Sequence, residues 1–334
     1  MSQDILLTGA TGFFGAFLLS EIVKTSKHTV RCLVRAPDEK QAWHRLRRNM
    51  SYYQLGETLS GDAVKAVPGD LSKPFLGLSK AQFDELAETV SVIYHNGALV
   101  NSLSTPSQLR STNVDSTLWL VTLAATSTSK KLHYISSISA GQDNGSAYGG
   151  SKRQAERIVM GAAARGLFMN VYRLPRLAHD SRTGMPNEKD IVFRLLDIIL
   201  RTGFAPDIDL SEDWIPVDLA ADALVGTAAI SHGGKMFSLA PRTKITLAHL
   251  LAVARENGFD IRVEQPGDWA ARIKKADSPE DNLTLSGLGM DDGAADGGSR
   301  NDDDDGFDVV DAPDVSRDML VRYFNWYRSA KTAQ

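Results

Sequence analysis

The fold is decided by residues 5–15, which read Ile5-Leu6-Leu7-Thr8-Gly9-Ala10-Thr11-Gly12-Phe13-Phe14-Gly15. The apolar run at 5–7 predicts a buried β-strand, and the apolar spacing over 12–24 predicts the helix that follows it. A strand, a glycine-rich loop and a helix in this order form the phosphate-binding corner of a dinucleotide-binding sheet. The glycines could merely mark a turn, but their place between strand and helix favours a phosphate site.

Each glycine of the loop has its own expected task. Gly9 permits the tight turn, Gly12 lets the backbone approach a pyrophosphate, and Gly15 allows the helix to pack closely. The start of the helix adds amide donors and a partial positive charge. The residues of this loop expected to contact the cofactor are Thr8, Gly9, Thr11, Gly12, Phe13, Phe14 and Gly15.

The end of the second expected strand, residues 29–34, indicates which dinucleotide binds. A protein that binds NAD(H) carries an acidic residue about twenty positions after the loop. Here the strand is followed by Arg35, whose guanidinium can pair with a 2′-phosphate, so the sequence predicts NADPH as the cofactor. Arg45 lies in the basic stretch that follows and is expected to add a second phosphate contact, although a solvated helix face also explains it.

Two more loops are expected at the same edge of the sheet, because the carboxyl ends of parallel strands lie together. They follow the strands predicted over residues 63–68 and 90–94. Their residues expected near the adenine and the nicotinamide ribose are Asp70, Leu71, Asn96, Gly97 and Ala98. Asp70 has an equally good alternative role, which is to cap the turn at Ser72.

A catalytic group is predicted where Ser137 closes the strand at 131–136 and Tyr148 and Lys152 open the helix at 148–165. A tyrosine with a pKa near 10 is a poor proton donor at neutral pH, so Lys152 is expected to lower the pKa of Tyr148. Tyr148 would donate a proton as hydride arrives, while Ser137 would hold the substrate carbonyl. Tyr148 and Lys152 would also contact the nicotinamide ribose. Alone, such a pair is usually surface decoration, but its order after a dinucleotide loop favours catalysis.

The alternation of strands and helices predicts an α/β fold: a Rossmann-type doubly wound parallel sheet with a smaller, mainly helical C-terminal substrate domain. We expect the NADP(H)-binding domain over residues 1–174 and the substrate domain over 175–334. A last strand of the first domain is expected over 168–172. The other helices are expected over 39–50, 80–88 and 109–126 in the first domain and over 190–202, 218–230, 246–256 and 315–330 in the second.

The composition is that of an ordinary globular protein. Of its 334 residues, 43% are hydrophobic and 23% charged, which excludes wholesale disorder and a collagen-like chain. Cys32 is the only cysteine, so an intramolecular disulfide and a multi-cysteine metal centre are excluded, and we expect no metal. Without a signal peptide or a membrane-length apolar run, the sequence predicts a cytoplasmic protein with neither a membrane nor a nucleic-acid partner.

Residues 286–311 form an acidic segment that we expect to be a mobile loop. The net charge of the chain is −4, and residues 291–311 alone hold nine aspartates against one arginine. Such a segment buries too little apolar surface to offset the entropy of ordering it. Asp302–Asp305 could instead bind calcium, but the spacing of an EF-hand loop is missing.

These residues resemble the extended short-chain dehydrogenase/reductases. More narrowly, the chain is similar to the terminal thioester reductase domains of nonribosomal peptide synthetases and to the reductase domains of carboxylic acid and α-aminoadipate reductases. The segments that carry the resemblance are Leu6–Phe13, Cys32–Ala36, Tyr94–Ala98, Arg110–Val114, Tyr172–Pro175, Ser181–Gly184 and Trp214–Asp218. The resemblance thins beyond Ile230.

The resemblance implies NADPH-dependent release of an acyl or peptidyl chain held as a phosphopantetheine thioester on a carrier domain. The thiohemiacetal formed first would collapse to an aldehyde, which some members reduce again to a primary alcohol. Ser137 stands where relatives commonly have threonine, and both residues supply a hydroxyl. The chain would be the excised terminal domain of a larger synthetase and a monomer.

Three rival functions share the predicted fold. A nucleotide-sugar epimerase or dehydratase would prefer NAD(H), against which Arg35 argues. A redox-independent Dieckmann cyclase or a non-catalytic NADP(H) sensor would not need Ser137, Tyr148 and Lys152 together. The intact set therefore favours the reductase.

Overall fold

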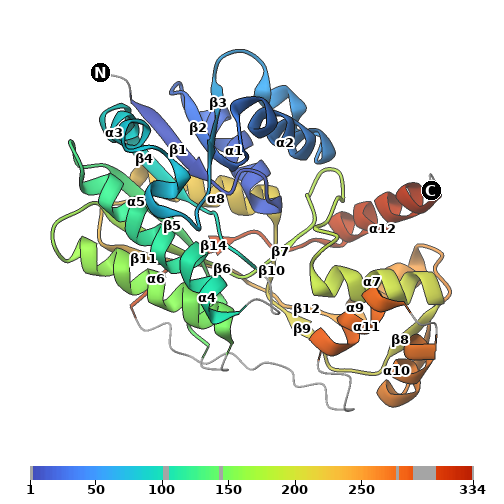
Figure 1. The fold of residues 1–334 in the computed structure, drawn as a ribbon. Helices are drawn as coiled ribbons and strands as arrows, with labels where there is room; N and C mark the ends of the chain where they lie inside the picture. Colours follow the sequence, from blue (N-terminus) through green and yellow to red (C-terminus); the bar gives the residue numbers. More distant parts are fainter. Residues whose placement is uncertain (1–2, 101–104, 143–145, 276–277, 289–305, 333–334) are drawn as a thin grey trace. The chain divides into compact units, whose positions relative to one another are not determined.

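The computed structural model describes residues 3–100, 105–142, 146–275, 278–288 and 306–332. These residues form two compact units, described in turn below (Figure 1). No helix within the described ranges is both long and apolar enough to cross a membrane.

The first unit is built on an eight-stranded sheet with the order β14-β11-β6-β5-β4-β1-β2-β3. The pairings from β3 across to β11 are parallel. The strand order reverses between β4 and β1, so loops leaving these two strands diverge and open the crevice where doubly wound sheets bind ligands. The strands are β1 (Asp4–Thr8), β2 (Val30–Arg35), β3 (Val64–Gly69), β4 (Val90–His95), β5 (Lys131–Ser137), β6 (Met169–Leu174), β11 (Lys235–Pro241) and β14 (Asp308–Ala312).

Helices cover both faces of this sheet, which confirms the predicted Rossmann-type fold. Every residue of β1 and β6 is buried, as expected for strands covered on both sides. Side chains of α3, α5 and α6 pack with the central strands in one hydrophobic cluster, and α1, α2 and α8 lie on the opposite face (Figure 1). The helices are α1 (Phe13–Thr25), α2 (Glu39–Tyr52), α3 (Lys80–Thr89), α4 (Pro106–Leu109), α5 (Ser116–Ala125), α6 (Ala147–Ala163) and α8 (Val217–Ile230).

The helix predicted over residues 109–126 is interrupted. A π-helical segment, Arg110–Asp115, joins α4 to α5. Ser116 and Thr117 donate their hydroxyl hydrogens to the carbonyl oxygens of Thr112 (2.5 Å) and Asn113 (2.7 Å). Hydroxyls that bond to carbonyls of the preceding turn compete with the regular hydrogen bonds of the helix, which explains the interruption. Such π-helical segments are frequent at functional sites.

The division of the chain differs from the predicted boundary between 174 and 175. Strands β11 and β14 and nearly all of α8 belong to the first unit, so the second unit does not run unbroken over 175–334. The physical reason is the edge of β6, whose backbone groups need partners. β11 supplies them in parallel register, with Lys235 opposite Asn170 and Ser238 opposite Arg173.

The structure also corrects the predicted bounds of the acidic loop, residues 286–311, at its C-terminal end. Residues 289–305, including the Asp302–Asp305 run, lie outside the described residues. Beyond them β14 (Asp308–Ala312) is ordered at the edge of the sheet beside β11. Its Asp308 pairs with Lys235 at 3.1 Å, and the Phe307 ring lies 4.1 Å from the guanidinium of Arg173. These contacts and the backbone pairing order a segment whose composition alone favours a loop.

The second unit is smaller and mainly helical, as predicted, with three two-stranded sheets. Its core is one apolar cluster in which Trp214 and Trp269 are almost completely buried. Short strands between the helices were expected here without assigned bounds, whereas helices α10 and α11 were not expected from the sequence. The elements are β7 (Arg176–Ala178), α7 (Ile191–Thr202), β8 (Phe204–Pro206), β9 (Ser211–Glu212), β10 (Trp214–Pro216), β12 (Ile245–Thr246), α9 (Leu247–Glu256), β13 (Arg262–Glu264), α10 (Pro266–Lys275), α11 (Pro279–Gly287) and α12 (Arg317–Thr332).

A buried ion pair ties α6 to the sheet of the first unit. Both carboxylate oxygens of Glu156 accept hydrogen bonds from Arg173, at 3.0 and 2.9 Å, and the Ser136 hydroxyl donates to the same carboxylate at 2.6 Å. Glu156 is 4% exposed and Arg173 7%. A bidentate pair with an extra donor is the arrangement that offsets the cost of burying two charges.

Replacing Arg173 by leucine is therefore expected to lower the free energy of unfolding by about 3–5 kcal/mol, because it leaves the Glu156 carboxylate buried without its cation. The double variant Arg173→Leu/Glu156→Leu should recover part of this loss. Urea unfolding followed by circular dichroism measures both. Equal stability of the wild type and the single variant would contradict the importance of the pair.

Candidate active site

The glycine loop after β1 is closed so tightly that side chains are excluded at two positions. Gly9 has φ +77°, and a Cβ added to it would lie 2.8 Å from the backbone of Gly97. A Cβ on Gly15 would lie 1.9 Å from the carbonyl oxygen of Gly9. Gly12 differs, because its Cβ would meet only that carbonyl, at 3.4 Å. Gly9 and Gly15 thus shape the loop, whereas Gly12 keeps its outer side open.

The start of α1 offers unpaired amide donors to a phosphate. No side chain of the described residues caps this helix at Gly12, and its first turn carries no acidic residue. The carbonyl oxygens of Ala10 and Gly12 instead accept hydrogen bonds from the Asn49 amide, each at 3.2 Å. The Gly12 N–H closes the loop onto the Gly9 carbonyl at 3.0 Å, so the N–H groups that fit a pyrophosphate are those of the first turn of α1.

A directed chain of hydrogen bonds joins the loop after β4 to the loop after β1. Gly97 N–H donates to Thr8 Oγ1 at 2.8 Å, and Thr8 Oγ1 lies 2.9 Å from His95 Nδ1. On the other side of the ring, His95 Nε2 lies 3.1 Å from Thr117 Oγ1, whose hydrogen goes to the Asn113 carbonyl. Thr117 must therefore accept from Nε2–H, which leaves Nδ1 to accept from the Thr8 hydroxyl.

The His95 ring stays neutral within this chain of hydrogen bonds. Burial, with a further contribution from the positive charge of Lys152, lowers the pKa of His95 to about 3. The neutral ring can donate on one side and accept on the other, as the chain requires. Sequence reasoning ended this strand at residue 94 and gave His95 no role. Its place directly after a strand expected to be buried was the available signal.

The expected phosphate-binding arginines come together at the end of β2. Arg45 donates from Nη1 to the carbonyl oxygen of Arg35. Arg35 is exposed and lies opposite Gly69 in the register of β2 and β3. Arg45 is thus turned to the end of the sheet rather than along a solvated helix face. The Arg45 guanidinium therefore lies beside the Arg35 backbone, at the strand end where the ribose of a dinucleotide lies in folds of this kind.

The expected residues of the other two loops lie at this same edge. Asp70 Oδ1 accepts from the backbone N–H and the hydroxyl of Ser72, at 3.0 and 2.7 Å, so the capping alternative is present. Leu71 packs so closely on Gly97 that a Cβ there would lie 2.5 Å from the leucine Cδ1. Asn96 donates to the carbonyl oxygen of Gly9 at 3.4 Å. Ala98 continues the Gly97 loop, half-buried.

Ser137 and the start of α6 are held together by a short helical turn, Ile138–Ala140. Ser137 ends β5, and its Oγ accepts from the backbone N–H of Ser139 at 3.2 Å. A Cβ on Gly149 would lie 2.4 Å from the carbonyl oxygen of Ser139, so α6 begins in direct contact with that turn. Tyr148, the residue before Gly149, lies in this first turn of the helix.

Lys152 is a buried cation, 3% exposed. Its Nζ donates to the carbonyl oxygen of Ile135 at 2.7 Å and lies 4.8 Å from the ring centroid of Tyr134. Burial lowers the pKa of Lys152 to about 8, and the negative charge of Glu156 opposes that shift. The side chain is therefore mostly protonated at neutral pH.

The expected lowering of the Tyr148 pKa is wrong. Burial raises the pKa of Tyr148 to about 12. The loss of solvation outweighs the ammonium of Lys152, which is bonded to Ile135 and lies over Tyr134. The phenol is therefore neutral at physiological pH and carries the proton that a donor must supply.

Asn113 is a site residue that sequence reasoning did not single out. It is 1% exposed in the π-helical segment, and its amide exchanges two hydrogen bonds with the backbone of Leu99, at 2.7 and 3.2 Å. Its Nδ2 also donates to Ser151 Oγ at 3.0 Å, and the Ser151 hydroxyl donates to the carbonyl oxygen of Tyr148 at 2.7 Å. Asn113 thus links the loop after β4 to the start of α6.

The sheet order, the glycine loop at the switch point and the tyrosine–lysine helix after β5 define a nicotinamide-dependent oxidoreductase of the extended short-chain dehydrogenase/reductase superfamily. The model of the male sterility protein family of NAD-binding domains matches residues 7–147 and 139–224. The chain belongs to this family and, within it, to the terminal reductase (R) domains of nonribosomal peptide synthetases.

Two similar proteins support this assignment, and a third shares the fold. A linear gramicidin synthase of Brevibacillus parabrevis is 35% identical over 294 residues, which are 82% of this chain but 6% of the synthase polypeptide. The terminal R domain of the myxalamid PKS-NRPS pathway has a TM-score of 0.87 and 31% identity, covering 99% of this chain and 91% of that one. An archaeal thiolation-reductase di-domain shares the fold, with a TM-score of 0.78, 19% identity, and coverage of 100% and 77%.

The glycine geometry predicts two separable effects. Gly12→Ala should leave the unfolding temperature within a few degrees of the wild type, because the added Cβ makes only an ordinary contact. The same methyl group fills the open side of the loop, so it should weaken nicotinamide dinucleotide binding at least about tenfold. Gly15→Ala should lower the unfolding temperature itself.

Thermal unfolding and fluorescence titration with the dinucleotide measure the two effects. Gly150→Ala is the control, since its Cβ would meet nothing within 4 Å. Unchanged affinity in Gly12→Ala would place the phosphates elsewhere.

Proposed function

We propose that this chain catalyses the NADPH-dependent reductive release of an acyl or peptidyl thioester from a carrier protein as an aldehyde; whether a second reduction to a primary alcohol follows is decided by the product analysis below. The observation that carries the proposal is the neutral phenol of Tyr148 one helical turn from the buried cation Lys152, on a sheet edge that also holds a dinucleotide loop. This pairing supplies a proton where a carbonyl oxygen would gain charge.

When bound, NADPH supplies the hydride. The hydroxyl of Ser137 donates a hydrogen bond to the thioester carbonyl oxygen, and Tyr148 gives that oxygen its proton. Lys152, one helical turn from Tyr148 and held by the Ile135 carbonyl, would be the nearby positive charge that stabilises negative charge as the proton leaves. The thiohemiacetal then loses the carrier thiol, which leaves the aldehyde.

The preference for NADPH rests on Arg35 and Arg45. A 2′-phosphate could pair with the guanidinium groups of Arg35 and Arg45 at the end of β2, a strand that itself carries no acidic residue for the hydroxyls of an unphosphorylated ribose. The other contacts we assign to the cofactor are those of the glycine loop, of Asp70 and Leu71, and of the Asn96–Ala98 loop.

The proposed partner is a phosphopantetheinylated carrier domain, and the proposed acting form is a cytoplasmic monomer. In the archaeal neighbour, a thiolation domain and a reductase domain together form a di-domain. This chain spans only 6% of the length of the gramicidin synthase polypeptide, and its carrier partner is inferred by likeness to these proteins.

Tyr148→Phe is expected to reduce turnover of an acyl-pantetheine thioester at least about a hundredfold, because a general acid contributes that much, while NADPH affinity stays within about threefold. NADPH oxidation at 340 nm, the absorbance of the reduced cofactor, measures the rate, and chromatography identifies the aldehyde or alcohol. Tyr94→Phe is a matched control, since that buried ring stacks on His133. A fully active Tyr148→Phe would refute the proton-donor role. Cofactor binding without thioester reduction by the wild type, even with a loaded carrier, would favour cyclisation or sensing.

Arg35→Asp should weaken NADPH binding by about ten- to a hundredfold and leave NADH nearly unaffected, because a charge-assisted contact to the 2′-phosphate is replaced by repulsion. Arg45→Ala should show the same selectivity with a smaller effect. Arg48→Ala, an exposed residue of the same helix, is the control. Equal losses for the two cofactors would remove the phosphate assignment.

A further inference from the structure

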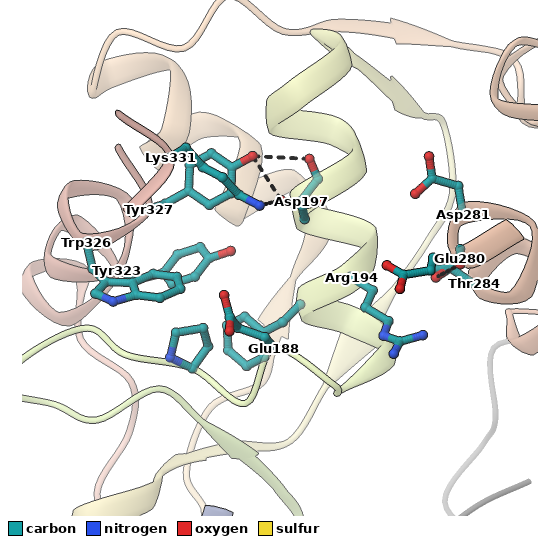
Figure 2. A pocket seen from close by; sticks show the side chains of 12 residues that line it. Glu188, Arg194, Asp197, Glu280, Asp281, Thr284, Tyr323, Trp326, Tyr327 and Lys331 are labelled. Atoms are coloured by element: carbon teal, nitrogen blue, oxygen red, sulfur yellow. Dashed lines mark hydrogen bonds and ion pairs between the residues drawn. The ribbon is translucent and has the colours of Figure 1, made fainter. Parts of the chain in front are cut away.

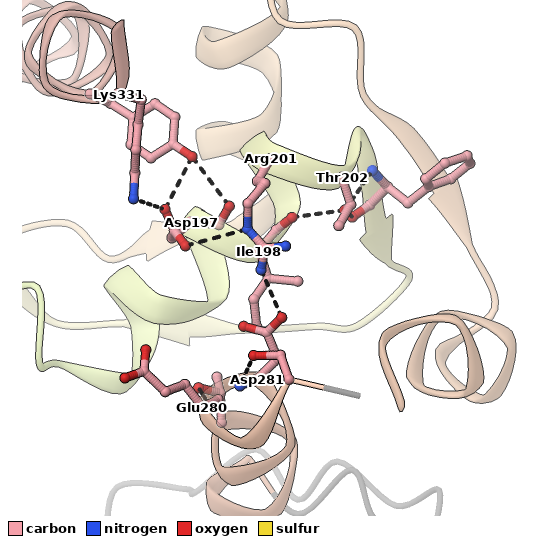
Figure 3. A network of polar contacts seen from close by, with 11 residues as sticks. Asp197, Ile198, Arg201, Thr202, Glu280, Asp281 and Lys331 are labelled. Atoms are coloured by element: carbon pink, nitrogen blue, oxygen red, sulfur yellow. Dashed lines mark hydrogen bonds and ion pairs between the residues drawn. The ribbon is translucent and has the colours of Figure 1, made fainter. Parts of the chain in front are cut away.

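The second unit contains a pocket of about 250 Å³, lined by residues of α7, α11, α12 and the segment before α7 (Figure 2). Its wall is part of the unit's own structure, since Tyr323 belongs to the apolar core. Two of its carboxylates are paired, Asp197 with Lys331 at 3.0 Å and Asp281 with Arg201 at 2.7 Å (Figure 3). These pairs connect helices of the second unit, whereas the buried polar network of the first unit lies beside the proposed catalytic residues.

The last three residues of β5 connect the proposed catalytic group to α6. The carbonyl oxygen of Ile135 accepts a hydrogen bond from Lys152 Nζ at 2.7 Å. The hydroxyl of Ser136 donates to Glu156 Oε1 at 2.6 Å. Ser137, which ends the strand, is the proposed partner of the substrate carbonyl. The strand end therefore holds Lys152 by a backbone oxygen and Glu156 by a side chain.

Lys152 and Glu156 lie one helical turn apart on the buried face of α6. A lysine and a glutamate four residues apart on a helix attract each other, and burial strengthens the attraction. Among the described residues, however, the Glu156 carboxylate pairs with Arg173 rather than with Lys152, and both of its oxygens are engaged. The Lys152 ammonium is left on the Ile135 carbonyl.

The guanidinium of Arg173 is itself held in place. Arg173 lies opposite Ser136 in the parallel register of β6 and β5, so both side chains reach the same carboxylate. A Cβ on Gly141, at the end of the turn that follows β5, would lie 2.7 Å from Arg173 Nη1. The ring centroid of Phe307 lies 4.1 Å from the guanidinium carbon. Packing of this kind fixes the planar fork that binds a carboxylate through two hydrogen bonds.

We propose that Arg173 is a positioning residue, which keeps the Glu156 carboxylate from drawing Lys152 out of its place. Without this guanidinium, Lys152 would be the cation one turn away from a buried carboxylate. Its ammonium would leave the Ile135 carbonyl and move along α6, away from Tyr148. The inference rests on the proposed function, because it concerns how the lysine is presented to the proton donor.

The protonation of Lys152 reports on this arrangement. Burial lowers the pKa of Lys152 to about 8, and the negative charge of Glu156 opposes that shift. Burial also raises the pKa of Tyr148 to about 12 and lowers that of His95 to about 3, so these two groups titrate far from Lys152. The ionisable groups around Lys152 are Tyr148 and Glu156 of α6, Tyr134 of β5, His95 of β4 and, beyond Glu156, Arg173 of β6. Because the ammonium form is the active one, the rate should fall as the pH rises through the pKa of Lys152.

Two single variants of the ion pair are expected to move this pH dependence in opposite directions. Arg173→Gln removes a positive charge and leaves the carboxylate to Lys152, so the pKa of Lys152 should rise by about one pH unit or more. Glu156→Gln removes the opposing negative charge, so the same pKa should fall by a similar amount. The pH profile of kcat, measured with an acyl-pantetheine thioester and NADPH, reports both changes. A merely structural role would destabilise both variants without opposite changes in the profile.

Arg173→Gln should also lower kcat at least about tenfold and leave KM within about threefold, because the displaced ammonium no longer faces the phenol. The double variant Glu156→Gln/Arg173→Gln has no carboxylate to draw Lys152, so it should recover most of that loss. Arg31→Gln is the matched control, since it breaks another partly buried ion pair of the first unit, with Asp4 at 2.6 Å, and should leave kcat and its pH profile unchanged. A double variant as slow as Arg173→Gln, or single variants whose profiles move the same way, would overturn the proposal.

Nuclear magnetic resonance separates this inference from the proposed function. In protein with isotope-labelled lysine side chains, the Lys152 resonance, assigned by its absence in Lys152→Met, is titrated without substrate. If the wild type reduces no thioester while the pKa of Lys152 rises in Arg173→Gln and falls in Glu156→Gln, the reductase function fails and the control of Lys152 by the ion pair stands. If one single variant does not fold, the other and the double variant carry the test, and the double variant should titrate near the wild type. An unchanged pKa of Lys152 in every single variant that folds would overturn the proposal.

Discussion

The close approach of Gly9 and Gly97 is the contact on which the site of the first unit depends. It brings the loops after β1 and β4 together at the switch point of the sheet, and only glycine fits where the two backbones meet. The chain of hydrogen bonds through Thr8, His95 and Thr117 holds this approach in place. Because His95 is buried and neutral, these hydrogen bonds all run in one direction, and the last of them ends at the Asn113 carbonyl in the π-helical segment.

From Asn113 the same constraint reaches the catalytic helix. Its amide fixes Leu99 on one side and Ser151 on the other, and Ser151 bonds to the Tyr148 backbone. The position of Tyr148 is thus set from the cofactor side of the sheet. Lys152 and Glu156 continue along the buried face of α6, where the Ile135 carbonyl and Arg173 compensate their charges.

The second unit meets a different physical requirement. Its apolar core is one cluster in which Trp214 and Trp269 are almost completely buried. Phe193 and Tyr323, two rings that line the pocket, belong to the same cluster, so the wall of the pocket is part of the packing that holds this unit together.

The sequence by itself determined the order of the strands from β1 to β6 and the glycine loop after β1, because apolar periodicity and the steric freedom of glycine are local properties. It also indicated Ser137 at the end of a strand and the pair Tyr148 and Lys152, which lie one helical turn apart. Only the tertiary structure decided that β14 joins the sheet, since its pairing partner, β11, lies about seventy residues earlier in the chain. The tertiary structure also decided the pKa of Tyr148 and the contact of Arg45 with Arg35. It likewise decided the roles of His95 and Asn113. Desolvation and contacts between distant segments set these properties, and neither can be read from spacing along the chain.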